Sequence, residues 1–384
     1  MSRTLRVMCV FGTRPDTIKM APVVHALDAH PQIDSIVCVT AQHRQMLDDL
    51  LDLFKIRPHY DLDIMTPDQT LTDITTRVLI GMEGVLKIAQ PDVVLVHGDT
   101  TTSTAASLAA FYQQIPVGHV EAGLRTSDPW VPFPEEMNRR LTGTIASYHF
   151  SPTSLARENL LQENVPDQNI IVTGNTVIDA FLETADRSDL PKAPNWEKLD
   201  PSRPIIVVTA HRRENHAHMR EMCEAMREIV QLPMRPQILW PVHPSPRVRP
   251  VAYAVLGTQD GVVLDDPLSY GEMVSAVRDC TFVLTDSGGI QEEAPCLGKP
   301  VLVMRDETER PEGVHAGTLE LIGHTRERIV QASTRLLTDR AYYEGMSRAV
   351  NPYGDGHASE RIVAWLLARL RDADYPEPFE AQSA

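Results

Sequence analysis

Residues 281–300, TFVLTDSGGIQEEAPCLGKP, predict a buried strand that passes into a helix through a tight glycine turn. The β-branched and apolar run 281–285 is typical of a strand inside a parallel sheet. The run 286–289 interrupts it, and we expect a helix over 290–297 that ends at Gly298. The unpaired N–H groups at the start of such a helix bind anions, and glycines allow a phosphate to approach the backbone.

Two interpretations of this turn stay open from its own residues. Glu292 and Glu293 fall in the first turn of the predicted helix, where a carboxylate can accept hydrogen bonds from the hydroxyls of a ribose. The same acids favour the start of any helix because of its dipole, so the stretch also fits a plain strand-to-helix turn. The rest of the chain has to decide between a phosphate site and an ordinary turn.

The alternation of apolar strands with helices continues on both sides of this stretch. The expected strands are 5–11, 33–40, 92–97, 116–120, 148–151, 170–173, 204–210, 237–242, 261–264, 281–285 and 300–304. The expected helices are 15–29, 42–53, 71–88, 100–113, 135–145, one beginning at 175–180, 219–230 and 360–372. This pattern predicts parallel sheets covered by helices.

The length of 384 residues exceeds what one hydrophobic core usually supports, which predicts two α/β domains. We place the first at residues 1–173, joined by residues 358–384 because the last predicted helix packs back on it. The second domain is expected at residues 174–357. The polar segment 188–203 contains three prolines and is predicted to be a surface loop.

The composition excludes several classes of protein. The formal net charge of −16 argues against a nucleic-acid partner, because phosphate backbones are held by excess lysine and arginine. The apolar runs fall short of the roughly 18 residues of a membrane-spanning helix. Five scattered cysteines without a CxxC pair favour a reducing cytoplasm. The motifs GxxxxGK[ST] and GxGxxG do not occur, which leaves an NTPase with a phosphate-binding loop or a dinucleotide dehydrogenase unsupported.

Polar residues follow the ends of several predicted strands, and open parallel sheets bind ligands at those ends. Arg14 and Lys19, in GTRPDTIK, are one helical turn apart and are expected to clamp a diphosphate. Two solvated cations are the alternative, which the helix dipole disfavours at a helix start. His211 follows the strand 204–210 and is expected to donate to a phosphate or to a leaving group.

Three acids are candidates for proton transfer. Asp99 and Glu121 each follow an apolar strand, although Asp99 alone also fits a helix N-cap. Glu135 and Arg139 are four residues apart and share one helix face. Carboxylates gathered in one cleft raise each other's pKa, so that one becomes a proton donor while another stays a base.

Two further features are weaker. His216 and His218 follow His211 with a spacing that fits no zinc site, so no metal is expected. Arg310 is a candidate cation for phosphate. Its alternative is a loop arginine paired with one of the nearby acids, Glu307, Glu309 or Glu312.

Seven motifs in one order resemble the non-hydrolysing UDP-N-acetylglucosamine 2-epimerases of bacteria. They are GTRPDTIKMAP, TAQHRQML, HGDTTTS, HVEAGLRT, PFPEEMNRRLTG, TAHRREN and TDSGGIQEEAPCLGKPVLVMRDETERPEG, spanning residues 12–313. The resemblance implies two Rossmann-like domains of the GT-B type, with parallel sheets facing a central cleft. It also implies a cytoplasmic homodimer that interconverts UDP-GlcNAc and UDP-ManNAc without NAD or metal and supplies ManNAc-type sugars for cell-surface polysaccharides.

The resemblance also assigns residues by matched position. The implied catalytic group is Asp99, Glu121, Glu135, Arg139 and His211. The implied contacts to UDP are Arg14, Lys19, His211, Leu268, Met273, Ser287, Gly288, Gly289, Glu293 and Arg310. A second, regulatory UDP-GlcNAc site is implied at Gln42, Gln45, Gln69, Glu136, Arg212 and His243.

The implied reaction eliminates UDP to give a 2-acetamidoglucal and adds it back after protonation of C2 from the other face. We expect Glu121 and Asp99 to handle the C2 proton, and Glu135 with Arg139 to orient the sugar. Asp16 stands where the family usually has Glu, and Ser245 where it usually has Asn, which puts the regulatory site and the sugar's substituents in question.

Four alternatives stay open. A hydrolysing 2-epimerase and an epimerase for a UDP-GlcNAc uronic-acid derivative are close in chemistry. A GT-B glycosyltransferase would use the same UDP site, and a non-catalytic nucleotide-sugar sensor would not need the three acids together.

Overall fold

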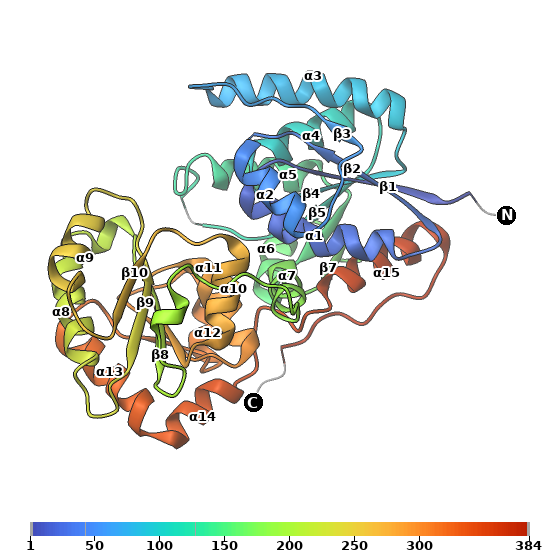
Figure 1. The fold of residues 1–384 in the computed structure, drawn as a ribbon. Helices are drawn as coiled ribbons and strands as arrows, with labels where there is room; N and C mark the ends of the chain where they lie inside the picture. The colour runs from blue at the N-terminus through green and yellow to red at the C-terminus, as the bar shows by residue number, and fades with distance from the viewer. Residues whose placement is uncertain (1–2, 43, 127, 382–384) are drawn as a thin grey trace. The chain divides into compact units, whose positions relative to one another are not determined.

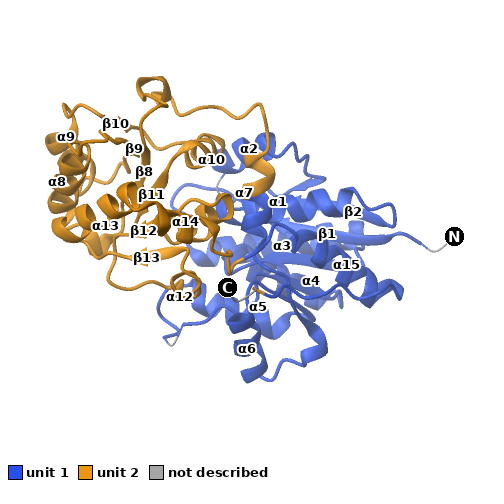
Figure 2. Cartoon of the chain, turned by 90° about the horizontal axis from the view of Figure 1, so that it is seen from below, with its two compact units in different colours: residues 1–180, 354–380 blue, residues 181–353, 381–384 orange. Residues whose placement is uncertain are grey.

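A computed structural model describes residues 3–42, 44–126 and 128–381. The chain forms two compact units, which Figure 2 shows in different colours. The N-terminal unit comprises Met1–Ala180 with Gly354–Glu380, and the C-terminal unit comprises Phe181–Tyr353 with Ala381–Ala384. Within the described ranges, no helix is both long enough and apolar enough to cross a membrane.

The N-terminal unit is built on a parallel sheet with the order β3-β2-β1-β4-β5-β6-β7. Its strands are β1 (Leu5–Phe11), β2 (Ile33–Val39), β3 (Tyr60–Asp61), β4 (Val93–His97), β5 (Val117–Val120), β6 (Tyr148–Ser151) and β7 (Ile170–Val172). Its helices are α1 (Arg14–Asp28), α2 (Arg44–Leu53), α3 (Leu71–Ala89), α4 (Thr101–Tyr112), α5 (Glu135–Ile145), α6 (Ser154–Gln162), α15 (Ala358–Arg371) and the start of α7 (Thr176–Ala185).

The C-terminal unit repeats this plan with the sheet order β10-β9-β8-β11-β12-β13, again parallel. Its strands are β8 (Ile205–Thr209), β9 (Gln237–Pro241), β10 (Val262–Asp265), β11 (Phe282–Thr285), β12 (Val301–Val303) and β13 (Leu319–Leu321). Its helices are α8 (Met219–Ile229), α9 (Arg249–Leu256), α10 (Tyr270–Asp279), α11 (Gly288–Glu293), α12 (Pro311–His315), α13 (Arg326–Thr338) and α14 (Arg340–Arg348). The predicted α/β class with two Rossmann-like units is confirmed.

Both sheets are buried because helices cover their faces. In the N-terminal unit Met8 and Val10 of β1 pack with Val78 and Met82 of α3 in one cluster of buried side chains. Figure 1 shows α3 and α4 on one side of the strands and α1 with α15 on the other. In the C-terminal unit Trp240 of β9 is completely buried in the corresponding core. Such two-sided burial explains why the strands are apolar along their whole length.

The predicted strands 5–11 and 148–151 and the helix 135–145 coincide with β1, β6 and α5. Most other predicted elements lie within one or two residues of the observed bounds. Several short or polar elements lack a clear apolar period and were not predicted. These are β3, β13, α6, α9, α10, α12, α13 and α14.

The predicted helix 290–297 was wrong in its bounds. Helix α11 begins at Gly288 and ends at Glu293, and residues Ala294–Leu297 continue as a 3₁₀ helix. Pro295 explains the change, because it has no N–H to donate and its ring disfavours a continuing α-helix. Glu292 and Glu293 therefore lie in the last turn of α11, not in its first turn.

The segment 188–203, predicted to be a surface loop, has no long element but is anchored at two points. Ala193 and Leu199 are buried, and the short 3₁₀ helix Trp196–Lys198 lies between them. The segment is therefore a loop, as predicted, apart from this short helix. Two buried apolar side chains anchor the loop to the unit.

The return of the chain to the N-terminal unit depends on Asp179. Its carboxylate accepts hydrogen bonds from the backbone N–H groups of Ala358 (3.3 Å) and Ser359 (2.7 Å), at the start of α15. Asp179 is buried, and burial raises the pKa of its carboxyl against the lowering effect of these bonds. α15 packs against α1, so Asp179 fastens the last helix to the unit that contains the first strand.

Replacing Asp179 with alanine is expected to destabilise the protein by roughly 2–3 kcal/mol, because two buried N–H groups lose a charged acceptor. Urea unfolding followed by circular dichroism measures this free energy. Asp374→Ala, which removes an exposed carboxylate beyond α15, is the matched control and should change it by less than about 0.5 kcal/mol. Equal effects of the two substitutions would contradict this role of Asp179.

Candidate active site

The order of the strands reverses direction between β1 and β4 in one sheet and between β8 and β11 in the other. In open parallel sheets, ligands bind outside the carboxyl ends of the strands at such a reversal. Residues that were predicted for the catalytic and UDP-binding site follow the strands at or beside these reversals. Asp99 follows β4, Glu121 follows β5, His211 follows β8 and Ser287 follows β11.

In the N-terminal unit, nitrogen atoms from α1, from β4 and from the residue before α7 converge on the carboxylate of Glu121. Lys19 of α1 forms an ion pair with it through Nζ. Asn175 Nδ2 donates to Oε2 over 2.9 Å, and His97 Nε2 lies 3.8 Å from the same oxygen. The Glu121 side chain is 9% exposed, so these contacts are largely shielded from solvent.

The backbone at Glu121 adopts an uncommon conformation, with φ of +62°. Residues other than glycine reach this region at a cost, and they concentrate at functional sites. The neighbours hold it there, because Gly98 N–H donates to the carbonyl of Val120 and Ala122 N–H donates to the carbonyl of Phe150. The sheet thus fixes the direction in which the Glu121 side chain leaves β5.

Asp99 lies beside this group and pairs with Arg139 of α5, whose Nη2 donates to Oδ2. Burial raises the pKa of the Asp99 carboxyl, Arg139 opposes the shift, and the carboxylate of Glu121 adds to it. The alternative N-cap role of Asp99 was wrong. Thr100 caps α4 instead, by accepting from the N–H of Ser103.

The neighbouring acids of α5 differ in their environment. Glu135 is the first residue of the helix and is partly exposed. Glu136 is completely buried, where it accepts from the backbone N–H of Thr126 (3.1 Å) and from Arg140 Nε (2.7 Å). Arg139 Nη1 lies 3.5 Å from the same carboxylate. Glu136 therefore fixes the N-terminal end of α5 against the preceding loop. Its assignment to a regulatory site stays a prediction.

The GTRPDTIK motif begins α1 with a capping box. Arg14 and Pro15 are the first two helical residues, and Thr13 is the N-cap. Asp16 accepts from the N–H groups of Gly12 (3.2 Å) and Thr13 (2.7 Å), and burial raises the pKa of its carboxyl to about 6. An aspartate is long enough for this local role. The predicted joint action of Arg14 and Lys19 on a diphosphate stays a prediction, since Lys19 is directed at Glu121.

In the C-terminal unit, Asp286 organises the end of β8. This completely buried carboxylate accepts from the backbone N–H groups of His211 and Arg212, both at 2.9 Å, and from Asn215 Nδ2 at 3.1 Å. The His211 ring stacks on His243, with centroids 5.4 Å apart. Burial lowers the pKa of His211, and the Asp286 carboxylate, 3.6 Å from Nδ1, opposes that shift.

The glycine turn after β11 is held tightly. Ser287 N–H donates to Thr285 Oγ1 over 2.9 Å, and Gly288 is the first residue of α11. A Cβ atom at Gly288 would lie only 3.3 Å from Arg212 Nη2, so a larger residue would crowd that guanidinium. Arg212 also lies 3.8 Å from Glu309.

The alternative pairing of Arg310 with Glu307, Glu309 or Glu312 stays a prediction, and the structure shows two other contacts of this residue. Its Nε donates to the carboxylate of Glu292, which is buried in α11, and its Nη1 donates to the backbone carbonyl of Glu309. Glu293 is partly exposed at the end of α11. Leu268 is buried just before α10, and Met273 is partly exposed within that helix.

The residues proposed for a regulatory site lie in both units. Gln69 Nε2 donates to the carbonyl of Gln42 (3.1 Å), and Thr102 Oγ1 donates to Gln42 Oε1 (3.0 Å). Gln45 and His243 are exposed, and the ring nitrogen Nδ1 of His243 accepts from Ser245 N–H. The predicted regulatory residues are thus polar side chains in both units. Their binding of a second UDP-GlcNAc stays a prediction.

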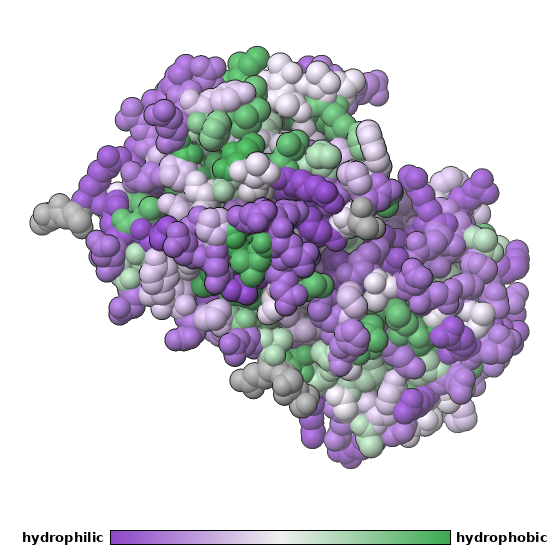
Figure 3. Space-filling view, turned by 180° about the vertical axis from the view of Figure 1, so that it is seen from behind, coloured by the Kyte–Doolittle hydropathy of each residue, from purple (hydrophilic) through white to green (hydrophobic). Residues whose placement is uncertain are grey.

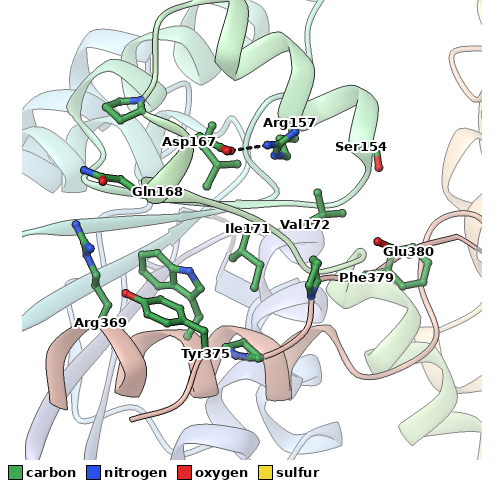
Figure 4. Close-up of a pocket in the computed structure, with 15 residues that line it drawn as sticks. Ser154, Arg157, Asp167, Gln168, Ile171, Val172, Arg369, Tyr375, Phe379 and Glu380 are labelled. Atoms are coloured by element: carbon green, nitrogen blue, oxygen red, sulfur yellow. Dashed lines mark hydrogen bonds and ion pairs between the residues drawn. The ribbon is translucent and has the colours of Figure 1, made fainter. Parts of the chain in front are cut away.

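A separate pocket lies at the edge strand β7 (Figure 4). Tyr375 lies on one side of it, and the ion pair of Arg157 with Asp167 lies on the other. Trp365 also lines the pocket, with its ring centroid 6.3 Å from that of Tyr375. No residue of the predicted site lines this pocket. The strand ends, where acids and bases converge, are the stronger candidate for chemistry.

Three residues of the candidate site were not predicted from the sequence. His97, Asn175 and Asp286 contact the predicted residues. His97 and Asp286 lie inside the quoted motifs HGDTTTS and TDSGGIQEE but were assigned no role, and Asn175 lies in none of the motifs. His97 is the last residue of β4 and Asp286 is the first after β11, so their place at strand ends was the available signal.

Comparison with known proteins gives a consistent result. The family model described as UDP-N-acetylglucosamine 2-epimerase matches residues 25–367. The UDP-N-acetylglucosamine 2-epimerase of Escherichia coli K12 is 56% identical over 371 residues, 94% of this chain and 98% of that protein.

Two solved structures are similar over nearly the whole chain. The crystal structure of a putative UDP-N-acetylglucosamine 2-epimerase from Listeria monocytogenes has a TM-score of 0.93 and 49% identity, covering 98% of this chain and all of that one. The Neisseria meningitidis UDP-GlcNAc 2-epimerase bound to UDP-GlcNAc has a TM-score of 0.84 and 47% identity, covering 94% of this chain and all of that one.

The contacts of His211 predict its titration. In Asp286→Asn the imidazolium loses a neighbouring negative charge, so the pKa of His211 should fall further. In His243→Ala the adjacent imidazole is gone, so that pKa should rise. NMR titration of labelled histidines measures both shifts, with His30 in the other unit as an internal reference. The same direction of change in the two variants would refute this account.

Proposed function

The chain belongs to the UDP-N-acetylglucosamine 2-epimerase family, and from this premise we propose that it interconverts UDP-GlcNAc and UDP-ManNAc without hydrolysing them. Its two Rossmann-like units are of the GT-B type. The observation that carries the proposal is the meeting of Asp99 and Glu121, two acids with different partners, at neighbouring strand ends.

The proposed reaction has two half-steps. The C1–O bond breaks and its electron pair leaves with the diphosphate of UDP, while a carboxylate removes the proton from C2 and a C1–C2 double bond forms. The product in the site is a 2-acetamidoglucal. Protonation of C2 from the opposite face and addition of the UDP oxygen to C1 then give the epimer, so atoms and charge balance without an external oxidant.

The acids have the surroundings that this chemistry needs. Glu121 is held by Lys19, which favours the ionised form of a carboxylate and suits a base. Burial raises the pKa of Asp99, which suits a group that returns a proton. We propose that these two residues serve the two faces of C2, and that Glu135 and Arg139 orient the sugar.

The departing diphosphate needs positive charge and N–H donors. We assign these to His211, Arg310 and the Ser287–Gly289 turn in the C-terminal unit, and to Arg14 and Lys19 in the N-terminal unit. Leu268 and Met273 would border the uracil, and Glu293 the ribose. The Neisseria meningitidis relative bound to UDP-GlcNAc supports this substrate class. Neither a nicotinamide cofactor nor a metal is required for the elimination.

Incubation with UDP-GlcNAc in D₂O tests the reaction. Wild-type protein should give intact UDP-ManNAc with deuterium at C2, detected by NMR and mass spectrometry, because the carboxylate exchanges its proton before returning it. Glu121→Gln should lower turnover at least ~10²-fold, since an amide cannot accept the C2 proton. The exposed Glu158→Gln in α6 is the matched control and should retain activity.

Other products would identify the competing functions. Release of free ManNAc indicates a hydrolysing epimerase, sugar transfer to an added acceptor indicates a glycosyltransferase, and binding without exchange indicates a sensor. Turnover of the Glu121→Gln variant near the wild-type rate would remove Glu121 from the mechanism.

We further propose that two copies of the chain associate through α3 and α4. Ile80 and Ile88, eight residues apart on α3, are 65% and 73% exposed. Phe111 and Tyr112 at the end of α4 are 60% and 63% exposed, and the two helices pack together. Green side chains gather near the top of Figure 3, where α3 and α4 lie. Exposed apolar surface of this kind favours burial against a partner.

Analytical ultracentrifugation tests the association. The wild type should sediment as a dimer at micromolar concentration, and Ile88→Lys combined with Phe111→Lys should shift it to monomer, because two charges would be buried without partners. Leu155→Lys, at an exposed apolar residue of α6, is the control and should stay dimeric. A monomeric wild type, or a dimer unaffected by the double substitution, would argue against this surface.

A further inference from the structure

We infer that Asn175 and His97 are positioning residues for the carboxylate of Glu121. The inference rests on the proposed function, because it assumes that Glu121 exchanges the C2 proton. Both residues are directed at one oxygen, Oε2, which Lys19 also contacts. Neither residue is part of the motifs' predicted catalytic or binding set.

The orientation of the Asn175 amide is fixed by the backbone. Asn175 is 4% exposed and lies just before α7. Its Oδ1 accepts from the N–H of Val177 over 3.1 Å, so the oxygen end of the amide is identified. The NH₂ end must then face Glu121, to which it donates over 2.9 Å. A side chain held at both ends can fix the direction of a carboxylate without adding charge.

His97 provides the second observation. It is 3% exposed at the end of β4. Its buried Nε2 lies 3.8 Å from Glu121 Oε2 and has no hydrogen-bond partner among the residues that the structure describes. A buried polar atom without a partner costs free energy, so such atoms are uncommon in folded proteins. A shift of under about 1 Å would let an Nε2–H donate to the carboxylate.

The charge state of His97 suits this role. Burial lowers its pKa to about 4, the Glu121 carboxylate opposes that shift, and the Lys19 ammonium adds to it. The imidazole is therefore uncharged at neutral pH. A neutral imidazole can stay beside Glu121 while this carboxylate gains and loses a proton, and it does not take up that proton itself.

The titratable groups that face Glu121 come from α1 and from the end of β4. Lys19 belongs to α1, Asp99 is the second residue after β4, and His97 is the last residue of β4. Lys19 supplies the positive charge, whereas Asn175 and His97 supply direction. Precise orientation of a base matters because proton transfer depends steeply on the geometry of donor and acceptor.

The pH dependence of kcat/KM for UDP-GlcNAc epimerisation tests the inference. Asn175→Asp keeps an acceptor for Val177 N–H but places a second carboxylate beside Oε2. The ionised form of Glu121 is then disfavoured, so the acidic limb of the profile should move upward by about one pH unit and kcat should fall ~10-fold or more. Affinity for UDP, measured by calorimetry, should change less than twofold.

Asn159→Asp is the matched control. Asn159 Nδ2 donates to the carbonyl of Gly123 over 2.9 Å, in the turn that follows Glu121, but not to the carboxylate. This variant should leave the acidic limb in place. His97→Asn, which retains an amide donor, should keep more of the kcat than His97→Leu, with KM similar in the two.

The outcomes separate the inference from the proposed function. If Glu121→Gln turns over normally, the role of Glu121 fails and the inference with it. If Glu121→Gln is inactive while Asn175→Asp, folded by circular dichroism, keeps the wild-type profile, the positioning role is overturned alone. Should Asn175→Asp not fold, the comparison of His97→Asn with His97→Leu decides, and equal kcat in these two overturns it.

Discussion

Parallel hydrogen bonding within each sheet is the constraint on which the rest of this structure depends. It places the carboxyl ends of neighbouring strands on one edge, so residues far apart in sequence become neighbours. His97 and Glu121 meet because β4 and β5 are paired, and His211 and Asp286 meet because β8 and β11 are paired. A sheet with antiparallel neighbours would send these side chains to opposite edges.

The two units use buried carboxylates differently at these edges. Asp286 accepts backbone and side-chain donors and thereby shapes the turn after β8. Glu121 and Asp99 are each paired with a cation, Lys19 and Arg139 respectively, and remain close enough to influence one another. Asp286 has a structural role, because backbone N–H groups and an asparagine amide occupy its carboxylate. Glu121 and Asp99 are two ionisable groups close to each other, and an elimination and re-addition mechanism would require such a pair to remove and return a proton.

Much of the fold was predictable because strands buried on both faces are continuously apolar and helices repeat with a different period. β1, α5 and β6 were found with their observed bounds. The errors have local causes. Pro295 ended α11 early, and Thr100 replaced Asp99 as a cap, since several polar residues near a helix start compete for that role. Short elements such as β13, with three residues, are too short to show a period.

The sequence by itself determined the α/β class, the family and the acids and cations that follow the strands. Each of these is carried by local pattern or by ordered motifs. Only the tertiary structure decided which partner each group has: Lys19 contacts Glu121, Arg310 contacts Glu292, and Asn175 and His97 converge on one carboxylate oxygen. These contacts join residues separated by up to 102 positions, and a hydrogen bond between distant residues depends on strand order and side-chain direction, which local sequence does not encode.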